Sequence, residues 1–132
     1  MKSVDHWPFI GTWRLVSYES QDDAGGVHYP MGRKVVGRLT YDKQGNMSAL
    51  VSRADVSPFA SGDFRGATEA EVRAAFDGFV AYFGTYTFNQ SADVVTHHVE
   101  SASFPNWTGT EQIRYVKAEG QRLVTVAHSR HS

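Results

Sequence analysis

The sequence contains no cysteine among its 132 residues, which excludes disulfide bridges, thiolate metal ligands and a cysteine nucleophile. It also lacks an excess of either charge: 13 basic and 14 acidic residues give a formal net charge of −1. Because nucleic acids and anionic lipids attract basic surfaces, this balance predicts no nucleic-acid partner. No apolar run approaches the roughly 18 residues of a membrane span, and Met1 to Pro8 lacks the apolar core of a signal peptide. We therefore expect a cytoplasmic protein without a membrane partner.

The chain also lacks the short motifs of common cofactor and catalytic sites. It has no Gly-x-x-x-x-Gly-Lys loop, no Gly-x-Gly-x-x-Gly turn, no His-Glu-x-x-His helix and no Gly-x-Ser-x-Gly elbow. His97 and His98 are adjacent in a strand-like run, so their side chains point to opposite faces and cannot bind one metal ion together. We predict neither a cofactor nor a metal site.

What the chain has in quantity is extended, aromatic-rich segments separated by turn residues. About eight such strands, joined mostly by hairpins, leave exposed edges unless the sheet closes on itself. We therefore predict an all-β fold, an up-and-down antiparallel barrel that forms one domain over residues 1–132. The predicted strands are Phe9 to Glu19, Val27 to Tyr29, Val35 to Tyr41, Asn46 to Arg53, Tyr82 to Asn89, Val94 to Ser101, Glu111 to Ala118 and Arg122 to Ala127.

One helix is predicted to interrupt the strands, around residues 68–80. Thr68 and Glu71 have the spacing of a capping box at its start. A stripe of apolar residues follows at helical spacing. The stripe and the preceding loop, residues 54–66, are interpreted first as packing elements and second as a gate over an opening. The stripe consists of Val72, Ala75, Phe76, Phe79 and Val80.

Several motifs follow one another along nearly the whole chain. They include Gly11-Thr12-Trp13-Arg14, Gly37-Arg38-Leu39-Thr40-Tyr41-Asp42, Tyr82-Phe83-Gly84-Thr85-Tyr86 and Phe104-Pro105-Asn106-Trp107. In this order the chain resembles the lipocalin-like domain family of bacteria and fungi. The resemblance implies a small barrel of lipocalin type in which Trp13 is a structural plug across the closed end, beneath an arginine such as Arg114 or Arg122.

His97 is the best candidate for chemistry. Val95, His97 and Val99 form the more apolar face of their strand, which places the imidazole inward. A buried imidazole needs a hydrogen-bond partner, and Tyr86 on the preceding strand is the one we predict. Three interpretations stay open: a satisfied core histidine, a polar contact for a ligand, and a general acid–base.

The other candidate residues surround this position. Tyr41, Tyr82 and Tyr86, with the flexible Met47, would line either a filled aromatic core or a ligand cavity. Arg114 shares a strand face with Gln112; if that face is inward, Arg114 needs Trp13, a protein carboxylate or a ligand carboxylate as its partner. Trp107 is a loop staple or part of the barrel mouth. The predicted ligand-binding set is His97, Tyr86, Tyr41, Arg114, Tyr82, Met47 and Trp107.

These residues favour binding of a small apolar or aromatic molecule inside the barrel. The first alternative is an isomerase, cyclase or lyase that acts on a polyketide-like substrate in the same cavity, with His97 as the acid–base. The second is a filled barrel with a structural or interaction role. An exposed edge such as Val27 to Tyr29 would permit a homodimer.

Overall fold

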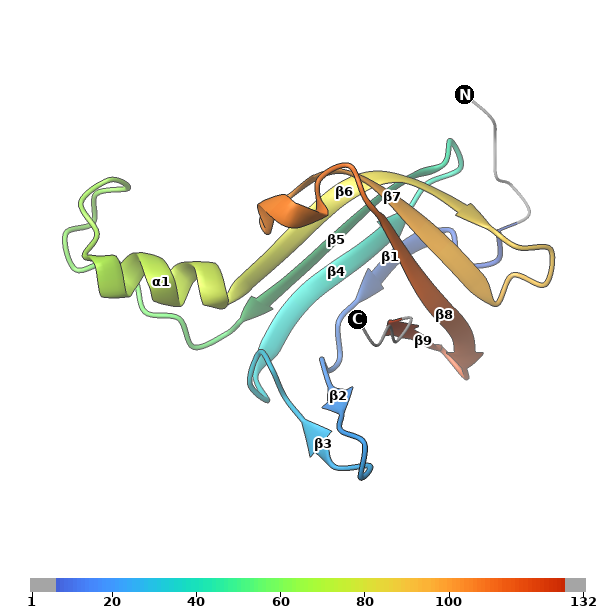
Figure 1. Cartoon of the computed structure of the whole chain (residues 1–132), viewed down its shortest axis with the longest axis horizontal. Helices are drawn as coiled ribbons and strands as arrows, with labels where there is room; N and C mark the ends of the chain where they lie inside the picture. Colours follow the sequence, from blue (N-terminus) through green and yellow to red (C-terminus); the bar gives the residue numbers. More distant parts are fainter. Residues whose placement is uncertain (1–6, 128–132) are drawn as a thin grey trace.

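The computed structural model describes residues 7–127, which form antiparallel strands wrapped into a nearly closed barrel (Figure 1). The short helix α1 extends from one end of the barrel, and a small two-stranded ribbon lies apart from the main sheet. The elements are β1 (Gly11–Arg14), β2 (Ser20–Gln21), β3 (Val27–His28), β4 (Val35–Tyr41), β5 (Asn46–Arg53), α1 (Glu69–Asp77), β6 (Phe79–Phe88), β7 (Val94–Ala102), the 3-10 turn η1 (Pro105–Trp107), β8 (Glu111–Glu119) and β9 (Arg122–Ala127).

The main sheet contains seven strands in the order β1-β4-β5-β6-β7-β8-β9. From β4 onward each strand pairs with the next one along the chain, as an up-and-down barrel requires. The predicted all-β barrel is therefore confirmed. β1 and β9 are the two ends of the strand order, so the pairing within residues 7–127 leaves the barrel open between them.

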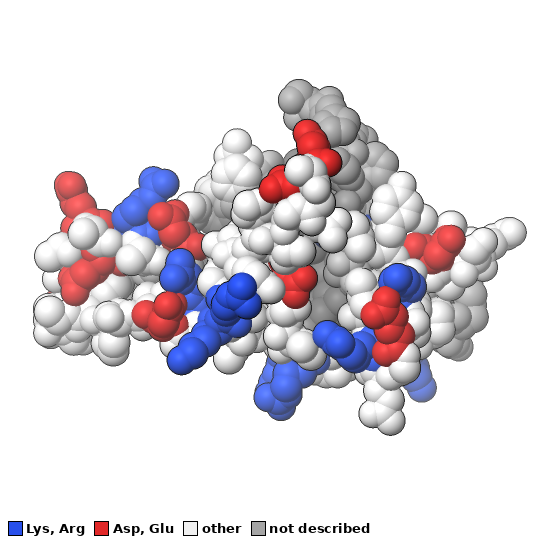
Figure 2. All heavy atoms as spheres, turned by 90° about the horizontal axis from the view of Figure 1, so that it is seen from below, with Lys and Arg blue, Asp and Glu red and all other residues white. Residues whose placement is uncertain are grey.

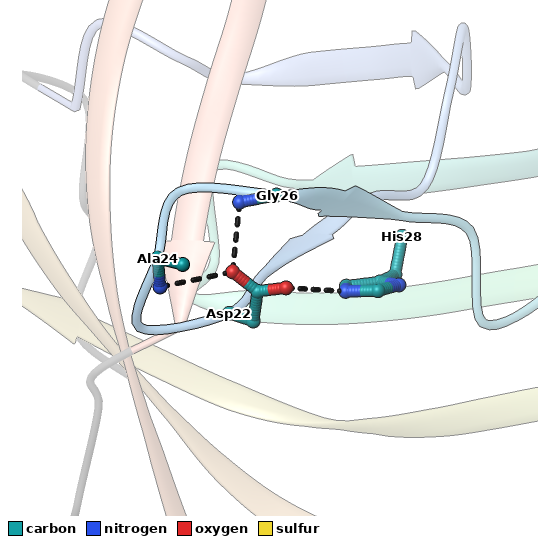
Figure 3. A network of polar contacts seen from close by, with 4 residues as sticks. All are labelled: Asp22, Ala24, Gly26 and His28. Atoms are coloured by element: carbon teal, nitrogen blue, oxygen red, sulfur yellow. Dashed lines mark hydrogen bonds and ion pairs between the residues drawn. The ribbon is translucent and has the colours of Figure 1, made fainter.

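The first predicted strand, Phe9 to Glu19, was too long. β1 ends at Arg14, and the two-residue strands β2 and β3 form a separate ribbon. The turn between them is organised by Asp22, whose Oδ1 accepts hydrogen bonds from the backbone N–H groups of Ala24 at 3.0 Å and Gly26 at 2.7 Å. Its Oδ2 lies 2.8 Å from Nε2 of His28 (Figure 3). This local network holds the ribbon together outside the barrel.

The capping box of α1 is confirmed. The Thr68 hydroxyl accepts from the backbone N–H of Glu71 at 3.2 Å, and the Glu71 carboxylate accepts from the Thr68 N–H at 2.8 Å. The predicted end at residue 80 was wrong because Gly78 caps the helix and its carbonyl pairs with the N–H of Arg53, at 2.8 Å. Phe79 therefore begins β6 instead of completing the helical stripe.

The apolar stripe of α1 does not enter the core. No residue of the helix is buried; Val72 is 54% exposed and Phe76 is 48% exposed. The helix extends past the barrel end instead of lying over the interior (Figure 1). Within residues 7–127 there is also no helix long and apolar enough to span a bilayer. On the face seen in Figure 2, basic and acidic side chains are interspersed.

The core is an aromatic cluster at the barrel end where β4 and β6 finish. Trp7 lies at its centre, 2% exposed, with its ring centroid 4.5 Å from that of Phe88 and 5.0 Å from that of Phe9. Tyr41 and Tyr86 pack edge-to-face beside it, with ring centroids 4.7 Å apart. These five rings fill that end of the interior.

Trp13 packs against this cluster from a partly buried position. Its indole N–H donates to the carbonyl of Phe9 at 2.9 Å, and the two rings lie 6.2 Å apart. The predicted arginine over the Trp13 ring was wrong: within residues 7–127 the cation–π contact is that of Arg33 over Tyr29, at 4.3 Å. Trp13 is therefore held by a hydrogen bond to the backbone of Phe9, just before β1.

Candidate functional site

His97 lies at the centre of a polar network inside the barrel. It is 2% exposed and lies on β7 between the buried Val95 and Val99, which confirms its inward direction. Its Nε2 is 2.7 Å from the hydroxyl oxygen of Tyr41, and its Nδ1 is 2.7 Å from that of Tyr82. Strands β4, β6 and β7 thus bring three polar side chains together in a mostly apolar interior.

His98 takes the opposite face, as strand alternation predicts. Its Nε2 lies 2.9 Å from the hydroxyl of Thr87, and its Nδ1 lies 3.0 Å from a carboxylate oxygen of Glu111. These contacts are on the outside of the sheet. The two adjacent histidines therefore belong to separate environments.

Tyr86 does not pair with His97, so that prediction was wrong. The two residues are directly opposite each other in the β6–β7 register. The Tyr86 hydroxyl, however, donates to the carbonyl oxygen of Asp42 at 2.7 Å. The Tyr86 N–H also donates to the carbonyl of Gly45 at 2.9 Å. Tyr86 therefore holds the β4–β5 turn against the barrel.

The imidazole of His97 is neutral at neutral pH. Burial, followed by the positive charge of Arg114, lowers the pKa of His97 from 6.5 to about 3. A neutral imidazole has one N–H and one bare nitrogen. One tyrosine must therefore donate to the bare nitrogen, while the other accepts from the N–H.

The network has one more polar hydrogen than its two hydrogen bonds use. Tyr41, Tyr82 and neutral His97 carry one polar hydrogen each, three in all, and the two contacts use two of them. The remaining hydrogen belongs to the tyrosine that accepts from His97. Burial raises the pKa of both tyrosines, so the hydroxyls stay protonated at neutral pH. The network thus offers one O–H donor to another group.

Arg114 faces the same interior. In the β7–β8 register it is opposite the buried Val95, and Gln112 is opposite His97. The side chain is partly buried, and its Nη1 donates to the carbonyl of Ile113 at 3.1 Å. In the part of the chain described, residues 7–127, no carboxylate forms an ion pair with it. The register thus gives Arg114 the inward one of the two directions that the sequence left open.

Met47 and Trp107 complete the predicted set. Met47 is buried on β5, opposite Tyr41 on one side and Gly84 on the other. Trp107 ends η1, and its ring packs edge-to-face on Tyr82 with centroids 5.8 Å apart. Trp107 therefore lies beside a tyrosine that contacts His97.

Gly84 allows the strands to approach each other at this level. It lies between Tyr82 and Tyr86 on the inward face of β6, beside a register shift in the β6–β7 pairing. A side chain at Gly84 would collide with the backbone carbonyl of His98. The glycine thus permits the register shift between Tyr82, which contacts His97, and Tyr86, which contacts Asp42.

Trp7 is the interior residue that sequence reasoning missed. Its ring contacts those of Tyr41 and Tyr86, with centroids 5.6 Å and 5.9 Å away. Its buried indole N–H has no hydrogen-bond partner among the described residues. Trp7 precedes the first strand and belongs to no periodic pattern, so only its size and apolar character pointed to burial.

The chain is similar to a known protein family and to a carrier protein. The model of the lipocalin-like domain matches residues 10–131. The 4'-hydroxy-3'-methoxypropiophenone carrier protein of Aspergillus oryzae is 35% identical over 83 residues, which cover 58% of this chain and 75% of that protein. No solved structure matches the chain.

Proposed function

Because this chain belongs to the lipocalin-like domain family, we propose that its barrel binds a small aromatic molecule. The observation that carries the proposal is the Tyr41–His97–Tyr82 network, which presents a spare hydroxyl donor inside a barrel of aromatic rings. Small-molecule sites have this composition: apolar walls with a few fixed polar groups. The similarity to a propiophenone carrier supports an aromatic ligand of similar size.

The ligand lies in the half of the interior away from the Trp7 cluster. At the level of Tyr82 the inward neighbours on β4, β5 and β7 are Leu39, Ala49 and Ala102, all partly exposed. Two of these side chains are single methyl groups, so they take up less room than the rings at the other end. A planar aromatic molecule there would have Trp107 and Tyr82 as its ring contacts and the spare hydroxyl as its polar contact.

The same network favours binding over catalysis. A histidine whose pKa is about 3 is a weak base at neutral pH. Both flanking tyrosines are held protonated by burial, so neither supplies a base in its place. The three groups therefore suit fixed hydrogen bonds better than proton transfer, which argues against the isomerase, cyclase or lyase alternative.

Calorimetric titration with 4'-hydroxy-3'-methoxypropiophenone tests this function. We expect saturable one-site binding to the wild type and to H98Q, which alters only the outer face. In H97Q the affinity should fall about tenfold, because the two tyrosine hydroxyls lose the ring nitrogens that position them. Absence of saturable binding, or equal binding by H97Q and H98Q, would contradict the proposal. Recovery of a chemically changed ligand would favour the enzyme.

A further inference from the structure

The described interior contains more hydrogen-bond donors than acceptors. The network of Tyr41, His97 and Tyr82 has one hydroxyl hydrogen to spare. The buried N–H of Trp7 has no partner among residues 7–127. Arg114 has five N–H donors; the Ile113 carbonyl accepts from one of them and the Tyr82 hydroxyl from another. The spare hydroxyl hydrogen, the indole N–H and the remaining guanidinium N–H groups have no acceptor in the hydrogen bonds of the described residues.

No acidic side chain among residues 7–127 is placed to satisfy them. None of the Asp and Glu residues among residues 7–127 is buried. Asp42 and Glu71 are partly buried, but Asp42 accepts from backbone N–H groups of its own turn and Glu71 caps α1. Glu111 pairs with His98 on the outer face. The partly buried charge of Arg114 therefore has no anion beside it in the described part of the chain.

The Arg114 guanidinium and the histidine network both contact the hydroxyl of Tyr82. Tyr82 contacts His97 through its hydroxyl, and the same hydroxyl interacts with Arg114 by charge and by a hydrogen bond. A ligand oxygen at this place would receive donors from both sides. Because the surroundings are mostly apolar, a charge-assisted hydrogen bond here is stronger than the same bond in water.

We propose that the barrel recognises an anionic oxygen on its aromatic ligand, a phenolate or a carboxylate, with Arg114 as the countercharge and the spare tyrosine hydroxyl as a second donor. This inference rests on the proposed function, because it specifies the chemistry of the same ligand. An anionic oxygen accepts several hydrogen bonds and donates none, so it matches a site made of donors. An ether oxygen at the same place would accept hydrogen bonds without neutralising Arg114.

The test compares ligands that differ only in the acidic hydrogen. The first pair is 4'-hydroxy-3'-methoxypropiophenone and its methyl ether, which cannot ionise. The second pair is benzoate and methyl benzoate. Affinities are measured by calorimetry with the full chain, and the absorption spectrum of the bound phenol reports ionisation, because a phenolate absorbs at longer wavelength than its phenol. We expect each ionisable probe to bind about tenfold or more tightly than its neutral partner, the phenol with a phenolate spectrum.

Two variants assign the effect to Arg114. R114M keeps the length of the stem and removes the charge, so it should bind the two members of each pair with equal affinity. R122M removes the same charge from the exposed Arg122 of β9 and should retain the preference. If R114M does not fold, the wild-type comparison of each pair and the bound spectrum still decide the question.

The outcomes separate this inference from the proposed function. Equal affinities within both pairs, or a bound phenol with the spectrum of its neutral form and no preference for benzoate, overturn the anion proposal and leave aromatic binding intact. A preference confined to benzoate supports the proposal and identifies a carboxylate as the anion. Failure of all four probes to bind overturns both proposals.

Discussion

The hydroxyl of Tyr41 and Nε2 of His97 lie 2.7 Å apart, although 56 residues separate them in the chain. Tyr41 is on β4 and His97 is on β7, and β5 and β6 lie between these strands in the sheet. The contact therefore crosses the barrel interior instead of joining neighbouring strands. It can form only when the sheet has wrapped round on itself, so this polar contact depends on the curvature of the barrel.

Replacement of His97 should destabilise the fold. H97A removes a buried ring and leaves the hydroxyls of Tyr41 and Tyr82 without their partner, which should lower the free energy of unfolding by about 2–4 kcal/mol. H98A is the matched control, because its ring is on the outer face; it should cost about 0.5 kcal/mol or less. Urea unfolding of both variants measures the difference. Equal losses would show that the buried network contributes nothing.

Stability should fall with acid in a way that depends on His97. The pKa of the folded form, about 3, lies below the ordinary value of 6.5, so the unfolded chain takes up the proton first. The contribution of the neutral imidazole is complete above 6.5 and declines as the pH falls toward 3. Between about pH 7 and pH 5 the wild type should lose about 2 kcal/mol more than H97Q. Parallel losses in the two proteins would contradict the lowered pKa.

Trp7 should stabilise the barrel through its ring and not through its N–H. W7F keeps an aromatic ring and removes a buried donor without a partner in the described residues, so we expect a loss of about 1–2 kcal/mol from the smaller volume. W7A removes the whole ring from the cluster and should cost about 3–5 kcal/mol. Denaturant unfolding distinguishes the two. A W7F loss as large as that of W7A would indicate that the indole N–H has a partner.

The Asp22–His28 contact should order only the β2–β3 ribbon (Figure 3). The hydrogen bond from His28, and then that from the Gly26 N–H, lower the pKa of Asp22, so its contribution is present above its unfolded pKa and is lost as the pH falls through the folded value. In D22N the amide hydrogens of Ala24 and Gly26 should exchange faster, while the global unfolding transition stays unchanged. D23N, at the neighbouring exposed aspartate, is the control. A shifted global transition in D22N would connect the ribbon to the core.

Strand positions were predictable where turn chemistry fixed them. The bounds of β4 and β5 match the sequence prediction because Asp42 binds the N–H groups of Gln44 and Asn46, and Gly45 adopts a φ of +91°. The first strand was overextended because alternation continues beyond Arg14, while the chain leaves the sheet there. Nothing in the local pattern distinguishes a strand that remains in the barrel from one that departs.

The sequence predicted the strand face of His97 but not its hydrogen-bond partners. Strand alternation placed His97 inside and left the direction of Arg114 open, and the register brought Tyr86 opposite His97. Alternation identifies neighbours on adjacent strands, however, and the partners of His97 include Tyr41 from across the barrel. Such a contact depends on curvature, which a sequence read strand by strand does not contain.

The most direct test of a ligand inside the barrel is the NMR signal of the His97 ring nitrogens during titration with 4'-hydroxy-3'-methoxypropiophenone. A ligand beside the Tyr41–His97–Tyr82 network should shift the His97 signals saturably, while those of His98 on the outer face stay in place. Constant His97 signals at ligand concentrations that saturate binding, or a lack of any binding, would contradict a ligand site beside this network.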